Sequence, residues 1–150
     1  MAQLSKRLVK DDGSILWFLH GKRHREDGPA IERASGSKFW FLSGKRHREN
    51  GPAVEYYDGT KWWCINGKFH REDGPAIERA EGSKYWYLHG KCHREDGPAI
   101  ELADGSKYWY LNDRELTEDL FNKLTKGPVK ELPLYLGLGF DDFISERLKE

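Results

Sequence analysis

The sequence predicts a mainly β fold, an elongated single-layer antiparallel β-meander of hairpin repeats with a short α-helical C-terminal cap. Three observations support this prediction. Aromatic, glycine and histidine residues recur every 23 residues, each repeat holds two short apolar runs separated by turn residues, and the repetition stops before an amphipathic C-terminal stretch. A fixed period of about 20 to 50 residues is typical of repeat architectures, in which each unit packs against its neighbours.

The period is carried by three columns of residues. They are Trp17, Trp40, Trp63, Trp86 and Trp109; Gly13, Gly36, Gly59, Gly82 and Gly105; and His24, His47, His70 and His93. Twenty-three residues are too few for two helices and a turn. Aromatic and β-branched runs punctuated by Asp-Gly, Ser-Gly, Glu-Gly and Asn-Gly pairs are instead typical of short strands joined by tight turns, so each unit is predicted to be a β-hairpin.

Each repeat is expected to supply two strands, which makes about ten strands in a meander. The first strands are placed at 38–43, 61–66, 84–89 and 107–112, and the second strands at 29–34, 52–57, 75–80 and 98–103. Residues 6–10 align with a second strand and 15–20 with a first strand. The segment Gly-Lys-x-His-Arg-Glu-Asp-Gly is predicted to form the loop between the strands of a unit.

The period is predicted to end at Leu111, because Asp113 replaces the expected glycine and no sixth repeat tryptophan follows. Residues 1–112 are therefore assigned to the repeat sheet and 113–150 to a helical cap. A terminal repeat must cover an otherwise open sheet edge, and a helix laid across the end is one solution.

The cap is expected to hold two helices. Thr117 can N-cap the first, which has acidic residues in its first turn and an apolar face, and Gly127-Pro128 ends it. A second is expected from about residue 141. The apolar segment 132–140 between them is interpreted as cap packing, with self-association as the alternative.

Composition excludes several classes of protein. The 150 residues carry 25 Lys plus Arg and 25 Asp plus Glu, so the zero net charge argues against a DNA or RNA binder and against a polybasic membrane protein. The amino end lacks the apolar core of a signal peptide, and no run approaches a membrane span. Cys64 and Cys92 fall in different columns, so free thiols and a cytoplasmic location are expected.

The His-Arg loops contain an acid, a base and a cation close together. Their repeated residues are His24, Arg25, His47, Arg48, His70, Arg71, His93 and Arg94. Equivalent residues on successive hairpins should lie about 10 Å apart, too far to share one metal ion. A structural role is favoured, in which Asp and Gly shape the turn and Arg pairs with Glu; recognition of a ligand and catalysis are the alternatives. No catalytic residue, metal or cofactor is assigned.

Both faces of the first strands are apolar. Trp, Leu and Ile are predicted to form the filled side, and Phe, Tyr, Ala and Glu a partly exposed strip. The candidate binding residues of this strip are Phe39, Phe41, Trp62, Tyr85, Tyr87, Tyr108, Tyr110, Glu55 and Glu78. Cross-strand stacking alone explains such a strip, and binding of a partner is the alternative. The glutamate column on the same strip would repel phosphates, which again argues against nucleic acid.

An aromatic strand followed by Gly-Lys-x-His, a second glycine and Asp-Gly resembles the MORN repeat, specifically a divergent form with His-Arg-Glu-Asp-Gly-Pro-Ala at the loop. The resemblance covers roughly residues 5–112 and implies a 23-residue β-hairpin unit. Repeats of this divergent form are common in bacteriophage and bacterial genomes, which implies a small phage or bacterial protein.

The leading hypothesis is a non-enzymatic repeat module that presents a sheet face to a protein partner. The resemblance to phage-borne repeats suggests an inhibitor or decoy of a host defence complex, in the host cytoplasm if the protein is phage-encoded. A binder of a small anionic ligand between neighbouring His-Arg loops is the first alternative. A structural or oligomeric component is the second, and an enzyme is the least favoured.

Overall fold

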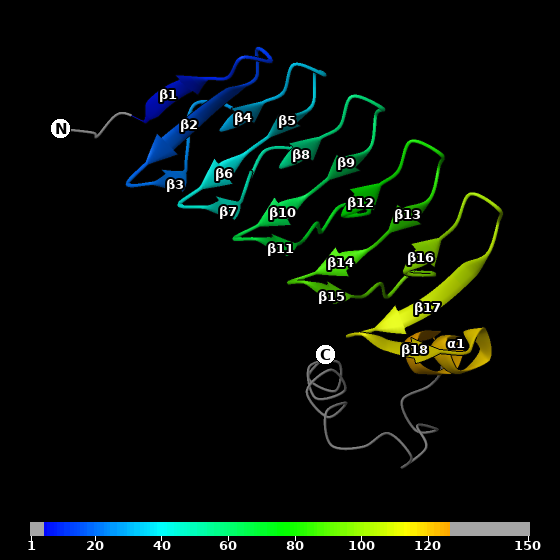
Figure 1. Ribbon diagram of the computed structural model, residues 1–150. Coiled ribbons are helices and arrows are strands. Elements are labelled where there is room, and N and C mark those ends of the chain that lie inside the picture. Colours follow the sequence, from blue (N-terminus) through cyan, green and yellow to red (C-terminus); the bar gives the residue numbers. More distant parts are fainter. Residues whose placement is uncertain (1–4, 127–150) are drawn as a thin grey trace.

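The computed structural model of the protein describes residues 5–126. It is mainly β: short antiparallel hairpins follow one another in a single-layer array, and one helix lies at the C-terminal end (Figure 1). The tight hairpins project along one edge of the array, and the turns that connect successive repeats lie along the opposite edge. The predicted fold class is confirmed.

The described residues hold eighteen strands and one helix. In chain order they are β1 (Lys6–Val9), β2 (Ile15–Leu19), β3 (Lys22–Arg23), β4 (Ile31–Glu32), β5 (Lys38–Phe39), β6 (Phe41–Leu42), β7 (Lys45–Arg46), β8 (Val54–Glu55), β9 (Lys61–Trp62), β10 (Cys64–Ile65), β11 (Lys68–Phe69), β12 (Ile77–Glu78), β13 (Lys84–Tyr85), β14 (Tyr87–Leu88), β15 (Lys91–Cys92), β16 (Ile100–Glu101), β17 (Lys107–Leu111), β18 (Arg114–Leu116) and α1 (Glu118–Lys126).

Each repeat contributes to the array in two parts. A continuous antiparallel sheet has the order β1-β2-β4-β5-β8-β9-β12-β13-β16-β17-β18. Beside it, β6–β7, β10–β11 and β14–β15 form separate two-stranded hairpins, and β3 pairs with β2. Neighbouring hairpins are joined by backbone hydrogen bonds, for example from the Gly67 N–H to the Arg46 carbonyl oxygen at 2.8 Å.

The strands are shorter and more numerous than predicted, because Trp40, Trp63 and Trp86 each interrupt a ladder, whereas Trp17 and Trp109 lie within β2 and β17. The Trp40 N–H donates to the Ala53 carbonyl at 2.8 Å, and the Trp40 carbonyl accepts from the His47 N–H at 3.1 Å, so the predicted strand 38–43 divides into β5 and β6. The predicted second strand 52–57 is reduced to β8. The loop was predicted to begin too early, since Lys45 and Arg46 form β7.

The tight hairpins turn through two residues that both have positive φ, the requirement of a type I′ turn. In Ser43-Gly44 these angles are 50° and 82°, and in Asn112-Asp113 they are 51° and 67°. Asn and Asp tolerate this left-handed conformation better than most residues. Asp113 therefore continues the array in place of glycine, and the predicted end of the period at Leu111 comes one strand too early, before β18.

The connecting turns on the opposite edge are tied together by hydroxyl groups. The Ser37 Oγ accepts from the Tyr57 N–H at 3.1 Å, and the Thr60 Oγ1 accepts from the Ala80 N–H at 3.1 Å. Equivalent bonds to Ser14 and Ser83 measure 3.1 and 3.0 Å. Each turn is thus fastened to the next one along the array.

The cross-strand register decides which columns share a face. Ile31 pairs with Phe39, and Val54 pairs with both Phe39 and Trp62. The isoleucine column therefore lies on the same face as the Phe and Tyr columns, not with the Trp column as predicted. We call this the aromatic face; its residues are Ile31, Phe39, Phe41, Val54, Trp62, Cys64, Ile77, Tyr85, Tyr87, Ile100, Tyr108 and Tyr110.

The opposite face, called here the loop face, carries the repeat tryptophans and the His-Arg loops. Glu55 pairs with Lys38 and Lys61, and Glu78 pairs with Lys61 and Lys84, so both glutamates lie on the loop face. Their predicted place on the aromatic strip is wrong. Their strand neighbours Val54 and Ile77 belong to the aromatic face, and successive residues of a strand point to opposite sides.

The core is thin and divides into two clusters. One lies on the aromatic face near the amino end and contains Leu16, Ala30, Ile31, Phe39, Phe41 and Val54. The other joins the last hairpin to the helix and contains Leu111, Leu116, Phe121 and Leu124. Phe39 and Phe41, which were predicted on an exposed strip, are instead buried at 8% exposure.

The predicted cap helix is confirmed as α1. The Thr117 Oγ1 accepts from the Leu120 N–H at 3.3 Å, and Phe121 is buried at the last hairpin. The predicted second helix and the segment 132–140 lie outside the described residues. Within residues 5–126 no helix is both long enough and apolar enough to span a membrane.

Candidate functional site

The His-Arg loops form a regular set of contacts on the loop face. In the third copy, Arg71 lies over the Trp63 ring at 4.0 Å, its Nε donates to Asp73 at 2.8 Å, and its Nη1 donates to Glu78 at 2.8 Å and to the Pro75 carbonyl at 3.3 Å. The first and fourth copies repeat these contacts through Arg25 and Arg94.

The sequence predicted that Arg and Glu of the loops pair locally or between neighbouring loops. Arg71 instead pairs with a glutamate outside the loop. The partner is Glu78 of β12, seven residues beyond Arg71, and not the adjacent Glu72. The guanidinium also lowers the pKa of Asp73 through a hydrogen bond and its charge. In the second copy Asn50 replaces the aspartate, and Arg48 keeps its contacts with Glu55, Pro52 and Trp40.

The loop histidines bind the next hairpin. The His24 Nδ1 accepts from the Ser43 N–H at 3.0 Å, and equivalent bonds from Asn66 to His47, His89 to His70 and Asn112 to His93 measure 3.1 Å. The other ring nitrogen of His24 faces Glu26 at 3.5 Å. Each imidazole thus joins one repeat to the next. The bond occupies the acceptor nitrogen, Nδ1, whose lone pair a neutral histidine would need to act as a catalytic base.

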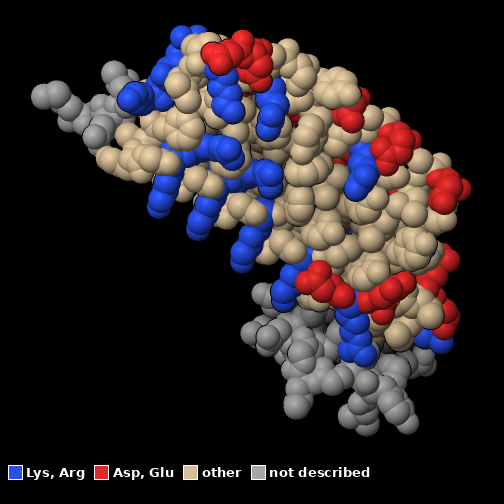
Figure 2. All heavy atoms as spheres, in the orientation of Figure 1, with Lys and Arg blue, Asp and Glu red and all other residues tan. Residues whose placement is uncertain are grey.

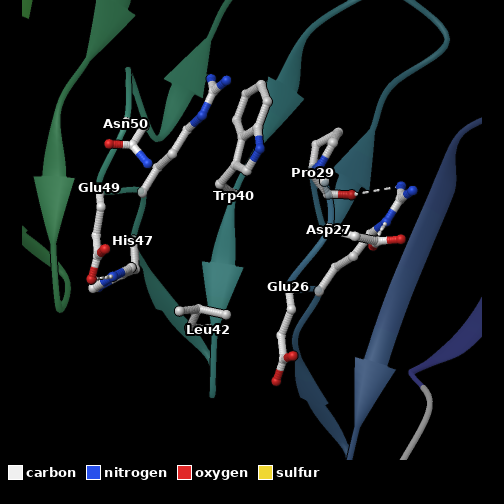
Figure 3. Close-up of a pocket in the computed structure, with 11 residues that line it drawn as sticks. Glu26, Asp27, Pro29, Trp40, Leu42, His47, Glu49 and Asn50 are labelled. Carbon is white, nitrogen blue, oxygen red and sulfur yellow. Dashed lines mark hydrogen bonds and ion pairs between the residues drawn. The ribbon is translucent and has the colours of Figure 1, made fainter.

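Grooves separate successive His-Arg loops. Three of them have volumes of about 650, 670 and 530 Å³. In the first, Trp40 and Leu42 lie between the two loops, with Glu26 on one side and Glu49 on the other (Figure 3). Two guanidiniums line each groove, against at least three carboxylates. The grooves therefore have an acidic excess, which disfavours a small anion.

Metal chemistry receives no support from this arrangement. No group of three or more His, Cys, Asp or Glu side chains in the described part of the chain is placed to hold a metal ion. The acidic, basic and cationic side chains of each loop do lie close together. They form pairs with one another, such as His24 with Glu26 and Arg71 with Asp73.

The aromatic face carries a chain of ring contacts across three repeats. Phe39 and Tyr56 have centroids 5.6 Å apart, Tyr56 and Trp62 5.1 Å, Trp62 and Phe69 5.6 Å, and Phe69 and Tyr87 5.4 Å. The first three contacts are edge-to-face, the geometry that the ring quadrupole favours. These rings therefore contact one another across strands, mostly edge-to-face and not by stacking.

The rings become more accessible toward the carboxyl end. Phe39 and Phe41 are buried, whereas Trp62, Tyr85, Tyr87 and Tyr110 are half-buried. Tyr108 is 39% exposed. Seven of the nine residues predicted for the strip thus share one face, while Glu55 and Glu78 do not.

A column of arginines on the aromatic face was missed by sequence analysis. Arg23 lies over the Phe41 ring at 5.6 Å, Arg33 over Phe39 at 5.7 Å, Arg46 over Trp62 at 5.4 Å and Arg79 over Tyr85 at 5.4 Å. All four are exposed, and none makes an ion pair with another described residue. The recurrence of Gly-Lys-Arg at 21–23 and 44–46 was the available signal.

The two cysteines are free thiols, as predicted, and both are buried. Burial raises the pKa of Cys64 to about 11, with Arg46 opposing the shift, and raises that of Cys92 to about 12, with Asp113 adding to it. Neither has the low pKa of a reactive cysteine.

The chain was also compared with known proteins. No protein-family model and no curated protein matches it. The function is therefore argued from the geometry of the two faces.

Proposed function

We propose that this protein is a non-enzymatic repeat module that binds a protein partner through its aromatic face. The row of partly exposed rings carries the proposal. They come from β9, β13, β14 and β17 and lie on one side of the array; they are Trp62, Tyr85, Tyr87, Tyr108 and Tyr110. Tyr and Trp are the residues most enriched among interface anchors, because they offer large contact area with few rotatable bonds.

The construction of the loop face supports a rigid scaffold behind this surface. The His-Arg loops, the tryptophans and the glutamates bind one another within and between repeats. A sheet whose loop face is fixed by these contacts loses little conformational entropy when a partner binds its aromatic face, and a small entropy loss favours affinity.

The loop contacts weigh against the alternative of a small anionic ligand. Arg71 already gives Nε and Nη1 to two carboxylates and a carbonyl, and the grooves beside it carry an excess of negative charge. An anion would have to displace these partners. The oligomeric alternative depends on the segment 132–140, outside the described residues.

The resemblance to divergent MORN-type repeats of phage and bacteria supports a finer proposal about the biological role. On that analogy the partner belongs to a bacterial protein complex, and the module acts as an inhibitor or decoy of a host defence system. Fold-level analogy, and no particular residue, supports this step.

The proposal is tested with two matched double variants on the same strands. Tyr85→Ser with Tyr108→Ser truncates the aromatic face, and Lys84→Ser with Lys107→Ser truncates the loop face. Tagged proteins are used to capture partners from bacterial lysate, and a captured protein is purified and titrated by calorimetry.

We expect a stoichiometric protein that binds the wild type and the lysine variant, and whose affinity for the tyrosine variant falls at least about tenfold, as loss of interface anchors predicts. Circular dichroism checks that both variants fold. A partner that binds both variants equally would show that the aromatic face is not the interface, and retention of a small molecule alone would favour the ligand alternative.

A further inference from the structure

Basic side chains gather along the edge formed by the tight hairpins. We call this set the hairpin edge; its residues are Lys22, Arg23, Lys45, Arg46, Lys68 and Lys91. All six are exposed. Figure 2 shows Lys and Arg side chains projecting side by side from this edge, while acidic side chains lie along the opposite, turn-bearing edge. The zero net charge of the chain conceals this separation.

Within residues 5–126 the charges of the hairpin edge have no carboxylate partners. Among the described residues none of these six makes an ion pair, whereas every arginine of the His-Arg loops makes at least one. Ion pairs within the fold therefore do not explain why these cations recur along the hairpin edge. Unpaired cations that repeat once per hairpin form a surface complementary to a negatively charged partner.

The row is also held in register. A β-carbon built on Gly44 would lie 3.6 Å from the Lys22 Cβ, and one built on Gly67 would lie 3.7 Å from the Lys45 Cβ, so each lysine stem packs on the glycine of the next hairpin. Arg23 and Arg46 are held over Phe41 and Trp62. Pre-positioned cations lose less side-chain entropy when they bind.

The spacing of the row matches an extended polypeptide. Successive repeats are separated by two strands, so equivalent cations recur about every 9.6 Å. An extended chain advances about 3.3 Å per residue, so carboxylates at every third residue recur about every 10 Å. Aspartate or glutamate at that period would meet one lysine per repeat, and at the first two hairpins an adjacent arginine as well.

We propose that the hairpin edge binds an extended acidic segment of the protein partner, with carboxylates near every third residue. This rests on the proposed function, because the segment is part of the same partner that contacts the neighbouring aromatic face. Arg23 and Arg46 bind carboxylates through planar, bidentate contacts, and the lysines add point charges.

Single-stranded nucleic acid is the competing polyanion, and the rings argue against it. Proteins that bind single strands without sequence preference stack bases on open aromatic faces. Here Phe41 is buried beneath Arg23, and Trp62 lies between Arg46 and the edges of two neighbouring rings. Both rings beside the hairpin-edge arginines are therefore already in contact with a cation.

The test uses two triple variants with the same change in charge. Lys22→Gln/Lys45→Gln/Lys68→Gln neutralises the hairpin edge, and Lys38→Gln/Lys61→Gln/Lys84→Gln neutralises three exposed lysines of the loop face. Fluorescence anisotropy measures binding of a labelled twelve-residue peptide with glutamate at every third position, one of the same composition with the glutamates clustered at one end, and an oligothymidylate of equal charge.

We expect the wild type to bind the spaced peptide more tightly than the clustered one, and the hairpin-edge variant to bind it about tenfold more weakly, the sum of three modest charge contacts. The loop-face variant should bind as the wild type does. Binding of neither peptide, equal loss in both variants, or tighter binding of the oligothymidylate would overturn the proposal.

The remaining outcomes separate this inference from the proposed function. If a captured partner depends on Tyr85 and Tyr108 but its affinity is unchanged by the hairpin-edge variant, the acidic-segment proposal fails and the proposed function stands. If the peptide binds as expected while no protein depends on the tyrosines, the proposed function fails and the charge complementarity of the edge stands. Self-association abolished by the hairpin-edge variant would assign the edge to a second copy and overturn the proposal.

Discussion

Arg71 on the loop face lies on Trp63 and donates to Asp73, Glu78 and the Pro75 carbonyl, whereas Arg79 on the aromatic face lies over Tyr85 with no carboxylate partner among the described residues. The two residues are eight positions apart in one repeat. The first has its charge compensated within the fold, and the second leaves its charge available to solvent or to a partner. The loop face therefore compensates its arginine charges within the fold, and the aromatic face leaves its arginines exposed.

The largest effect should come from removing a loop arginine. Arg71→Ala leaves Glu78 without its partner and uncovers Trp63, so we expect the free energy of unfolding to fall by about 2–3 kcal/mol. Urea unfolding followed by tryptophan fluorescence measures this loss. Arg79→Ala is the matched control and should cost less than about 0.5 kcal/mol; equal losses would show that the two faces do not differ as described.

The next effect concerns the links between repeats. His24→Leu removes the acceptor of the Ser43 N–H, and we expect a loss of about 1 kcal/mol in the free energy of unfolding. His24→Asn offers an oxygen acceptor in place of the ring nitrogen and should recover part of that loss. If Leu and Asn destabilise equally, the imidazole contributes by packing and the hydrogen bond does not matter.

The two buried cysteines, in β10 and β15, differ in the charge beside them. Burial raises the pKa of Cys64 to about 11 and that of Cys92 to about 12, from an ordinary 9.0. The pKa of Cys92 is the higher of the two because Asp113 disfavours its thiolate, whereas Arg46 favours the thiolate of Cys64. Their contribution to stability is complete below pH 9.0 and is lost as the pH rises through these values.

Intact-mass measurement of alkylation tests this difference. Both thiols should react slowly with iodoacetamide at pH 8, and at higher pH Cys64 should react before Cys92. Rapid reaction of both at pH 8 in the folded protein would contradict their burial. Cys64→Ser and Cys92→Ser assign the two modified masses.

The smallest expected effect is a gain. The second His-Arg loop has Asn50 where the other copies have an aspartate paired with the arginine Nε at 2.6–2.8 Å. Asn50→Asp should form the missing pair with Arg48 and raise the free energy of unfolding by about 0.5 kcal/mol at low salt, with less gain at high salt. A loss of stability would show that the second loop is built differently from the others.

The sequence analysis was most accurate about features that depend on neighbours along the chain. The strand at residues 6–9 and the helix that follows Thr117 were both predicted, because turn residues and capping residues act within a few positions. The break at Trp40 was missed, since it depends on a hydrogen bond to Ala53 across the array.

The assignment of faces failed for a different reason. Alternation shows that Ile31 and Glu32 lie on opposite sides of their strand, but it does not show which of Phe39 and Trp40 lies beside Ile31. The turn decides this: its closing bond, from the Arg33 N–H to the Ser37 carbonyl, sets Ile31 opposite Phe39. A shift of one residue would exchange every side chain between the faces.

The sequence by itself determined that this protein is an array of β-hairpins with a helical end, because a 23-residue period with paired turn signals leaves few other ways to bury its apolar residues. Only the tertiary structure decided which charges are compensated within the fold and which remain exposed. Arg71 and Arg79 are the same residue type in the same repeat. Their roles differ because the His-Arg loop folds Arg71 back onto Glu78 of β12, whereas Arg79 lies over Tyr85 without a carboxylate partner among the described residues.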